Sequence, residues 1–67
     1  MISVNGEPSD VRAGETVAAV LERLGVEPGR RGVAVAVDGE VVPRSDWEGL
    51  PLADGSRIEV LTAMQGG

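Results

Sequence analysis

Only one segment of this chain repeats its apolar residues with the period of an α-helix, and this restricts the folds that the chain can adopt. The spacing i, i+3, i+4, i+7 places apolar side chains on one face of a helix. Thr16 can cap the start of this segment, and Gly25 can end it. The sequence therefore predicts one principal helix over residues 16–24, which packs through Val17, Val20, Leu21 and Leu24.

Elsewhere the apolar residues alternate with polar or small ones, which is the pattern of β-strands. Asn5-Gly6 and Asp38-Gly39 are strong signals for tight hairpin turns, and Asp54-Gly55 marks a third turn. The expected strands cover residues 2–5, 9–12, 33–37, 40–42 and 57–62. Val and Ile, which favour sheets, supply most of their apolar side chains.

Smaller features refine this prediction. Pro8 lacks a backbone N–H, so the second strand should lie at an edge of the sheet. Pro43 should end the short strand over residues 40–42, and Ser45 can cap a single helical turn that carries Asp46 and Trp47. Trp47, the only aromatic residue, is expected to cap the core.

The order of elements is strand, strand, helix, strand, short strand, single turn, strand. A lone helix after a hairpin indicates an α+β layer with the helix across one face of a mixed sheet. Because the connection through the helix must be right-handed, the simplest topology is the β-grasp, with four to five strands and the final strand beside the first. We expect a β-grasp domain over residues 1–62 and a flexible tail over residues 63–67.

The composition excludes several classes of function. The chain of 67 residues has room for one small domain, and it contains no Cys, His, Lys or Tyr. A Ser nucleophile would therefore have no adjacent His or Lys base, so we expect no self-contained catalysis and no metal site. The net charge of −5 argues against nucleic acid as a partner and suits a protein with a basic face. No membrane span or signal peptide is visible, and we expect a cytoplasmic location.

The chain finishes with Gly66-Gly67 after a stretch without alternation. Glycine has no Cβ, so such an end can pass through a narrow channel and present its carboxylate to an enzyme. A frayed end would also explain the pattern, since glycine is frequent in this chain. The diglycine becomes a stronger signal when it is taken together with the strand order, because it lies shortly after the final strand.

Across essentially its whole length the sequence resembles the ThiS family of bacterial sulfur-carrier proteins of thiamin biosynthesis, within the ubiquitin-like ThiS/MoaD proteins. The similar segments are residues 2–6, the helix entry at residues 13–17, the segment Val42-Pro43-Arg44-Ser45-Asp46-Trp47, Asp54-Gly55 and the final Gly66-Gly67. The segment over residues 42–47 is the most discriminating of these.

The resemblance implies a reaction sequence centred on Gly67. A ThiF-like, E1-like activating enzyme would use ATP and magnesium to adenylate the Gly67 carboxylate, and a sulfur donor such as a cysteine desulfurase would convert it to a thiocarboxylate. A ThiG-like thiazole synthase would then accept the sulfur. Gly66 would give the end its reach, and the chain itself would hold no cofactor.

Strand alternation adds a docking hypothesis and leaves alternatives open. Ile58 and Val60 should face one side of the sheet, so Leu61 should be exposed beside Met64 and could anchor the activating enzyme. A molybdopterin-type sulfur carrier, a ubiquitin-like modifier and a plain β-grasp binding module share the same features. The absence of Lys rules out chains of this protein linked to its own lysines.

Overall fold

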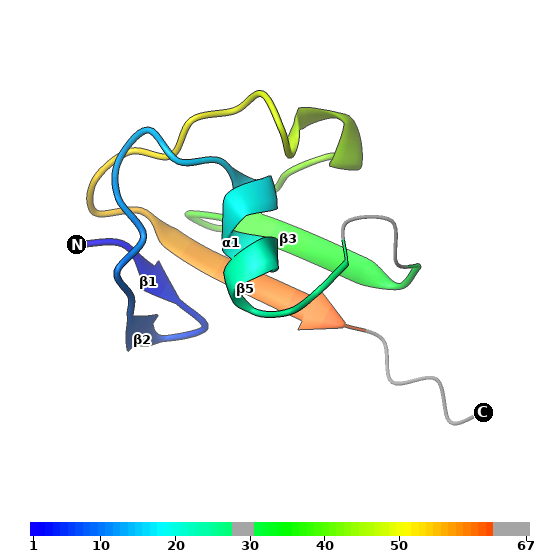
Figure 1. Cartoon of the computed structure of the whole chain (residues 1–67), viewed down its shortest axis with the longest axis horizontal. Coiled ribbons are helices and arrows are strands. Elements are labelled where there is room, and N and C mark those ends of the chain that lie inside the picture. Colours follow the sequence, from blue (N-terminus) through cyan, green and yellow to red (C-terminus); the bar gives the residue numbers. More distant parts are fainter. Residues whose placement is uncertain (28–30, 63–67) are drawn as a thin grey trace.

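A computed structural model of the chain describes residues 1–27 and 31–62, which form one mixed sheet covered on one face by a single α-helix (Figure 1). The five strands lie in the order β2-β1-β5-β3-β4. They are β1 (Ser3–Val4), β2 (Glu7–Pro8), β3 (Val33–Val37), β4 (Glu40–Val41) and β5 (Arg57–Thr62). The helix α1 spans Val17–Arg23, and a 3-10 turn, η1, spans Arg44–Asp46. This is the predicted β-grasp arrangement.

The last strand, β5, occupies the middle of the sheet. It runs parallel to β1, with Val4 opposite Ile58, and antiparallel to β3, with Val35 opposite Val60. The prediction that the final strand lies beside the first is confirmed. Neither helix in the described ranges is long and apolar enough to cross a membrane.

Both ends of α1 are fixed by local hydrogen bonds. Thr16 Oγ1 accepts from the N–H of Ala19 at 3.3 Å, which satisfies a donor of the first turn. At the other end Gly25 has a φ of +74°, and its N–H donates to the Glu22 carbonyl. The N–H of Val26 donates to the Leu21 carbonyl at 2.9 Å, which completes a Schellman motif. The predicted helix and both caps are confirmed.

The predicted apolar face of the helix is wrong at its last member. Val17, Val20 and Leu21 are buried, whereas Leu24 is 46% exposed. Leu24 is the C-cap residue, so it lies where the chain leaves the helix rather than on the packed face. The Schellman motif instead turns Val26 back, and Val26 packs against the core.

The core lies between α1 and the covered face of the sheet. Its largest fully buried side chains are Ile2, Val17, Val20, Leu21, Val35 and Ile58. Trp47 is 3% exposed and its Nε1–H donates to the Val42 carbonyl at 3.0 Å, so the predicted core role of Trp47 is confirmed. Burying the indole with its N–H paired avoids the cost of an unsatisfied polar group.

The second strand begins earlier than predicted. Asn5 and Gly6 both have positive φ, at 52° and 83°, so they form a two-residue turn that pairs Val4 directly with Glu7. The strand is therefore Glu7–Pro8 rather than residues 9–12. It lies at the edge of the sheet, as Pro8 predicts.

Two details of the segment over residues 40–47 also differ from the prediction. The strand β4 ends at Val41, one residue before the predicted bound, although the Val42 N–H still donates to the Val35 carbonyl at 2.8 Å. The residue at the N-cap of η1 is Pro43, whose φ is −61°, and no side chain caps this turn. Ser45 lies inside the turn instead of capping it, because the proline already fixes the backbone at its start.

Candidate functional site

The strand that precedes the predicted sulfur-carrying end is held on both sides by other strands. Thr62, its last residue, lies opposite Val33 of β3. The predicted tail residues Gly66 and Gly67, and the docking candidate Met64, lie outside the described residues. The structure therefore describes the strand that precedes these residues, and this strand, β5, is the central one of the sheet.

Hydrogen bonds from the first hairpin turn fix the position of β5. Asn5 donates its backbone N–H to the Ile58 carbonyl at 2.8 Å. Its side-chain Oδ1 accepts from the N–H of Val60, also at 2.8 Å. Because β1 ends at Val4, the Asn5 side chain takes over the pairing that a longer strand would supply. Sequence reasoning identified Asn5-Gly6 only as a turn and missed this role.

The face of the sheet opposite α1 carries an apolar strip. Residues paired across neighbouring strands share a face, and the register places Leu61 opposite Ala34, and Ala36 opposite Val41. Leu61 is 66% exposed and Val41 is 76% exposed, so the predicted exposure of Leu61 is confirmed. We call Ala34, Ala36, Val41 and Leu61 the open-face strip. The exposure of Val41 on this face was not predicted. Strand alternation could have predicted it, because Val41 and the buried Val42 point to opposite faces.

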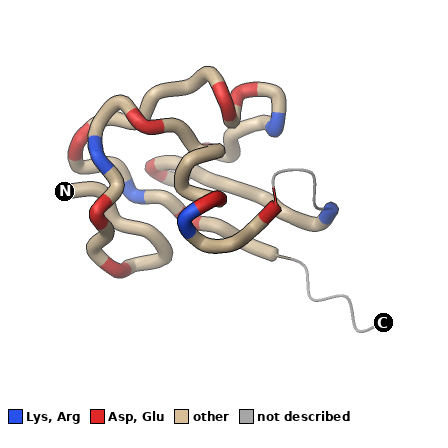
Figure 2. The backbone as a smooth tube through the Cα atoms, in the orientation of Figure 1, with Lys and Arg blue, Asp and Glu red and all other residues tan. Residues whose placement is uncertain are grey.

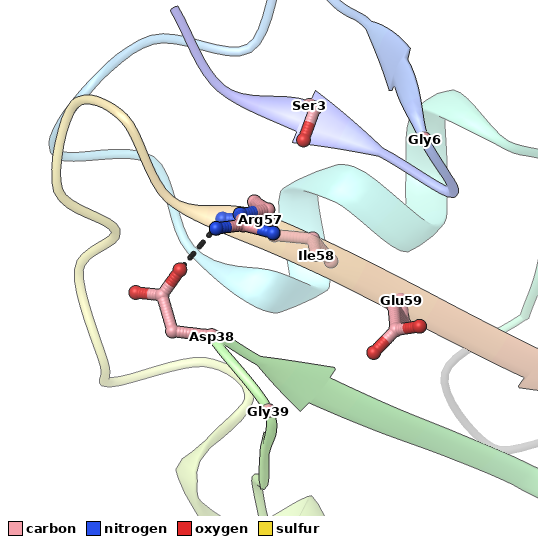
Figure 3. A pocket seen from close by; sticks show the side chains of 7 residues that line it. All are labelled: Ser3, Gly6, Asp38, Gly39, Arg57, Ile58 and Glu59. Atoms are coloured by element: carbon pink, nitrogen blue, oxygen red, sulfur yellow. Dashed lines mark hydrogen bonds between the residues drawn. The ribbon is translucent and has the colours of Figure 1, made fainter.

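Beside this strip the two hairpin turns and β5 enclose a hollow of about 460 Å³ (Figure 3). Its charged lining residues are Asp38, Arg57 and Glu59, and Ser3 contributes a hydroxyl. Asp38 Oδ1 accepts from the backbone N–H of Arg57 at 2.9 Å, which ties the second hairpin turn to the start of β5. The residues that line the hollow include no His or Lys.

The ionisable groups with shifted pKa values are Glu15, Arg23 and Asp54, and none of them lines this hollow. Glu15 accepts the backbone N–H of Arg12 at 2.7 Å, and its carboxylate is paired with the Arg23 guanidinium at 3.0 Å. These hydrogen bonds, the backbone one first, hold the pKa of Glu15 below its ordinary value. The N-terminal ammonium does the same for the pKa of Asp54. Within residues 1–27 and 31–62, no group of three acidic, His or Cys side chains could hold a metal ion.

We compared this sequence and fold with those of known proteins. The chain superposes on the crystal structure of the thiamine biosynthesis protein (ThiS) from Geobacter metallireducens with a TM-score of 0.75 and 34% identity, covering 98% of this chain and 97% of that one. It is 42% identical over 67 residues to the sulfur carrier protein ThiS of Thermus thermophilus, across the full length of both. The sulfur carrier protein ThiS of Escherichia coli is 32% identical over 66 residues, which are 98% of this chain and 97% of that protein.

A thiazole synthase of Paramagnetospirillum magneticum is also similar, with 38% identity over 64 residues. The similar stretch covers 96% of this chain but only 19% of the synthase. A sequence much like the whole of this chain is thus contained in that longer protein.

The mixed sheet, its single helix and the central last strand define a small ubiquitin-like protein of the β-grasp fold. The sequence model of the ThiS family matches residues 2–67, a range that includes Gly66 and Gly67. The chain belongs to the ThiS family.

Proposed function

We propose that this protein carries sulfur as a thiocarboxylate on Gly67 and delivers it for thiazole formation in thiamin biosynthesis. The observation that carries the proposal is the similarity to ThiS sulfur carriers along the whole chain, the diglycine included. The central position of β5 supports it, because the last residues continue from the best-anchored strand of the sheet.

The chemistry requires activation by a partner. A terminal carboxylate has a pKa of about 3.5, so at neutral pH it is ionised and is a poor electrophile. In the proposed sequence the Gly67 carboxylate oxygen attacks the α-phosphate of ATP and releases pyrophosphate. The acyl carbon of the resulting adenylate then accepts a sulfur nucleophile, and AMP leaves with the original carboxylate oxygen.

Two forms of sulfur, sulfide and a partner's persulfide, give a reaction in which atoms and electrons balance. Sulfide gives the thiocarboxylate directly. A persulfide on a partner gives an acyl disulfide, which a second thiol must cleave, and that thiol ends in a disulfide. This chain contains no Cys, so these thiols belong to partners such as a cysteine desulfurase and the activating enzyme.

This chemistry requires partner enzymes. A ThiF-like activating enzyme supplies the ATP site and the magnesium, and a ThiG-like thiazole synthase accepts the sulfur. The carrier contributes no catalytic group of its own. Because activation consumes ATP, we expect the protein to act in the cytoplasm.

The family match supports the thiamin pathway over the molybdopterin-type carrier and over a ubiquitin-like modifier. The contact with the activating enzyme is proposed to involve the open-face strip, with Leu61 as its anchor and Met64 as a second apolar contact. Exposed aliphatic side chains such as Leu61, the last residue but one of β5, can supply the few residues that dominate an interface.

An exchange assay tests the proposal at its first step. With the cognate activating enzyme, magnesium, ATP and labelled pyrophosphate, the full chain should support incorporation of label into ATP. Deletion of Gly67 should abolish this exchange, since adenylation depends on close alignment of the carboxylate with the α-phosphate. Exchange that persists without Gly67 would contradict adenylation at this residue.

A further inference from the structure

A cleft of about 330 Å³ lies at the β4 edge of the sheet, between the β3–β4 hairpin and the segment that follows η1. Its apolar lining residues are Val37, Val41, Val42, Pro43 and Leu50, and Leu50 is 41% exposed. Its charged lining residues are all acidic: Asp38, Glu40 and Asp46. The cleft shares Val41 with the open-face strip, and the proposed function makes no use of its other residues.

The wall of the cleft is held in place before any partner binds. The Trp47 Nε1–H bond to the Val42 carbonyl ties the segment over residues 42–47 to the buried core. The N–H of Leu50 donates to the Asp46 carbonyl at 3.0 Å, and the Arg44 guanidinium stacks over the Trp47 ring at 4.5 Å from its centre. A wall that is already ordered lowers the entropic cost of binding. This gives the Val42-to-Trp47 motif a use beyond core packing.

The negative charge of the cleft indicates which kind of partner could bind there. A second copy of this chain would bring three more carboxylates against the three already there, and each copy carries a net charge of −5. Figure 2 shows acidic and basic positions interspersed along the described backbone. The cleft instead suits a protein segment in which an aliphatic side chain is flanked by Lys or Arg.

One end of the cleft, at Val37, lies away from the end of β5 along the sheet. In the register, Val37 at the cleft is opposite Ile58, whereas Val33 is opposite Thr62. These two positions are four residues apart on β3, or about 13 Å at the usual rise of a strand. A segment bound at the Val37 end of the cleft would therefore contact the sheet away from Thr62.

We propose that this cleft is a second docking surface and that it binds a basic, aliphatic segment of the thiazole synthase. The inference rests on the proposed function, because it concerns the enzyme that accepts the sulfur. In the Paramagnetospirillum magneticum synthase a sequence like this chain is part of the same polypeptide as the synthase. Where the two are separate chains, a surface away from the reactive end can provide the corresponding lasting contact.

The test measures the dissociation constant of the cognate thiazole synthase for four forms of the carrier by calorimetry. Leu50→Arg places a cation among the proposed basic partner groups, and Glu40→Arg reverses one charge at the rim. Each should weaken synthase binding by about tenfold or more. Leu24→Arg is the matched control, because Leu24 is similarly exposed, at 46%, but does not line the cleft. It should bind the synthase as the unsubstituted protein does.

Two further measurements separate this inference from the proposed function. Thermal melts and Trp47 fluorescence verify that each variant is folded, and intact mass after activation reports the thiocarboxylate. Thiocarboxylate formation should be unchanged in both cleft variants. Its absence in the unsubstituted protein would refute the proposed function, whatever the synthase binds. Unchanged synthase affinity in folded Leu50→Arg and Glu40→Arg would overturn the docking surface alone. Equal weakening by Leu24→Arg would overturn it too.

Discussion

The side chain of Asn5 and the backbone N–H of Val60 are joined by a hydrogen bond of 2.8 Å across 55 residues of sequence. This bond fixes the first hairpin turn to the strand that leads to the end of the chain. Asn5 also has a φ of 52°, in the left-handed region that Asn and Gly tolerate best. One residue therefore shapes the turn and holds β5.

Two substitutions separate these roles of Asn5. Asn5→Gly keeps the backbone conformation but removes the acceptor, and it should lower the free energy of unfolding by about 1–3 kcal/mol because the Val60 N–H loses its partner. Asn5→Asp keeps an oxygen at the same place and should change the free energy by about 1 kcal/mol or less. Urea melts of both variants provide the comparison. Equal stability of the two would show that the hydrogen bond contributes nothing.

The buried face of α1 gives a second pair of substitutions to compare. Leu21→Ala should lower the free energy of unfolding by about 2–5 kcal/mol, because Leu21 is fully buried and the change leaves a cavity. Leu24→Ala should cost about 1 kcal/mol or less, since Leu24 is nearly half exposed. Chemical denaturation measures both values. A Leu24→Ala loss as large as that of Leu21→Ala would restore the face predicted from the sequence.

The Glu15 cluster predicts how stability depends on pH. The Arg12 N–H and the Arg23 guanidinium lower the pKa of Glu15 in the folded protein below its ordinary value of 4.5. Its stabilising contribution is therefore present above the unfolded pKa and is lost as pH falls through the folded pKa. Glu15→Gln, which cannot ionise, should be less stable than the unsubstituted protein near neutrality. The gap should narrow as the pH falls well below 4.5. Urea melts across this range measure the gap, and a gap that does not depend on pH would contradict the assignment.

Leu61 gives a prediction about the activating enzyme. Leu61→Asp places a charge in the open-face strip and should weaken that complex by about tenfold, because a charged group must then be desolvated at an apolar contact. Leu61 is 66% exposed, so the free energy of unfolding should change by about 0.5 kcal/mol or less. A titration with the activating enzyme measures the effect, and Leu24→Asp is the control for an exposed Leu on another surface. An unchanged dissociation constant for Leu61→Asp would remove Leu61 from the interface.

The elements with strong local patterns were the ones that the sequence predicted best. The bounds of β3 and β5 agree with the predicted 33–37 and 57–62, because alternation there is continuous and each strand lies between turn signals or breaks in pattern. The helix face failed at Leu24 because periodicity does not record where a Schellman motif turns the chain away. The second strand was misplaced because a two-residue turn begins pairing at once, at Glu7.

The candidate site was only partly predictable for a related reason. Alternation alone was enough to predict that Leu61 is exposed. The Asn5 bond to Val60, the hollow beside Arg57 and the acidic cleft at the β4 edge all bring together residues distant in sequence. Their positions depend on the sheet order β2-β1-β5-β3-β4. The sequence predicted the two hairpins and the adjacent β1 and β5, but not which side chains these strands bring together.

The central claim is that Gly67 carries the sulfur, and mass spectrometry of the intact protein tests it most directly. After incubation with the cognate activating enzyme, ATP, magnesium and a sulfur source, the mass should rise by the difference between one sulfur and one oxygen atom. Fragmentation should locate the change on Gly67. Deleting Gly67, or adding one residue after it, should abolish the shift, because either change misplaces the carboxylate relative to the α-phosphate. A shift located on another residue, or one that survives both changes, would contradict the account.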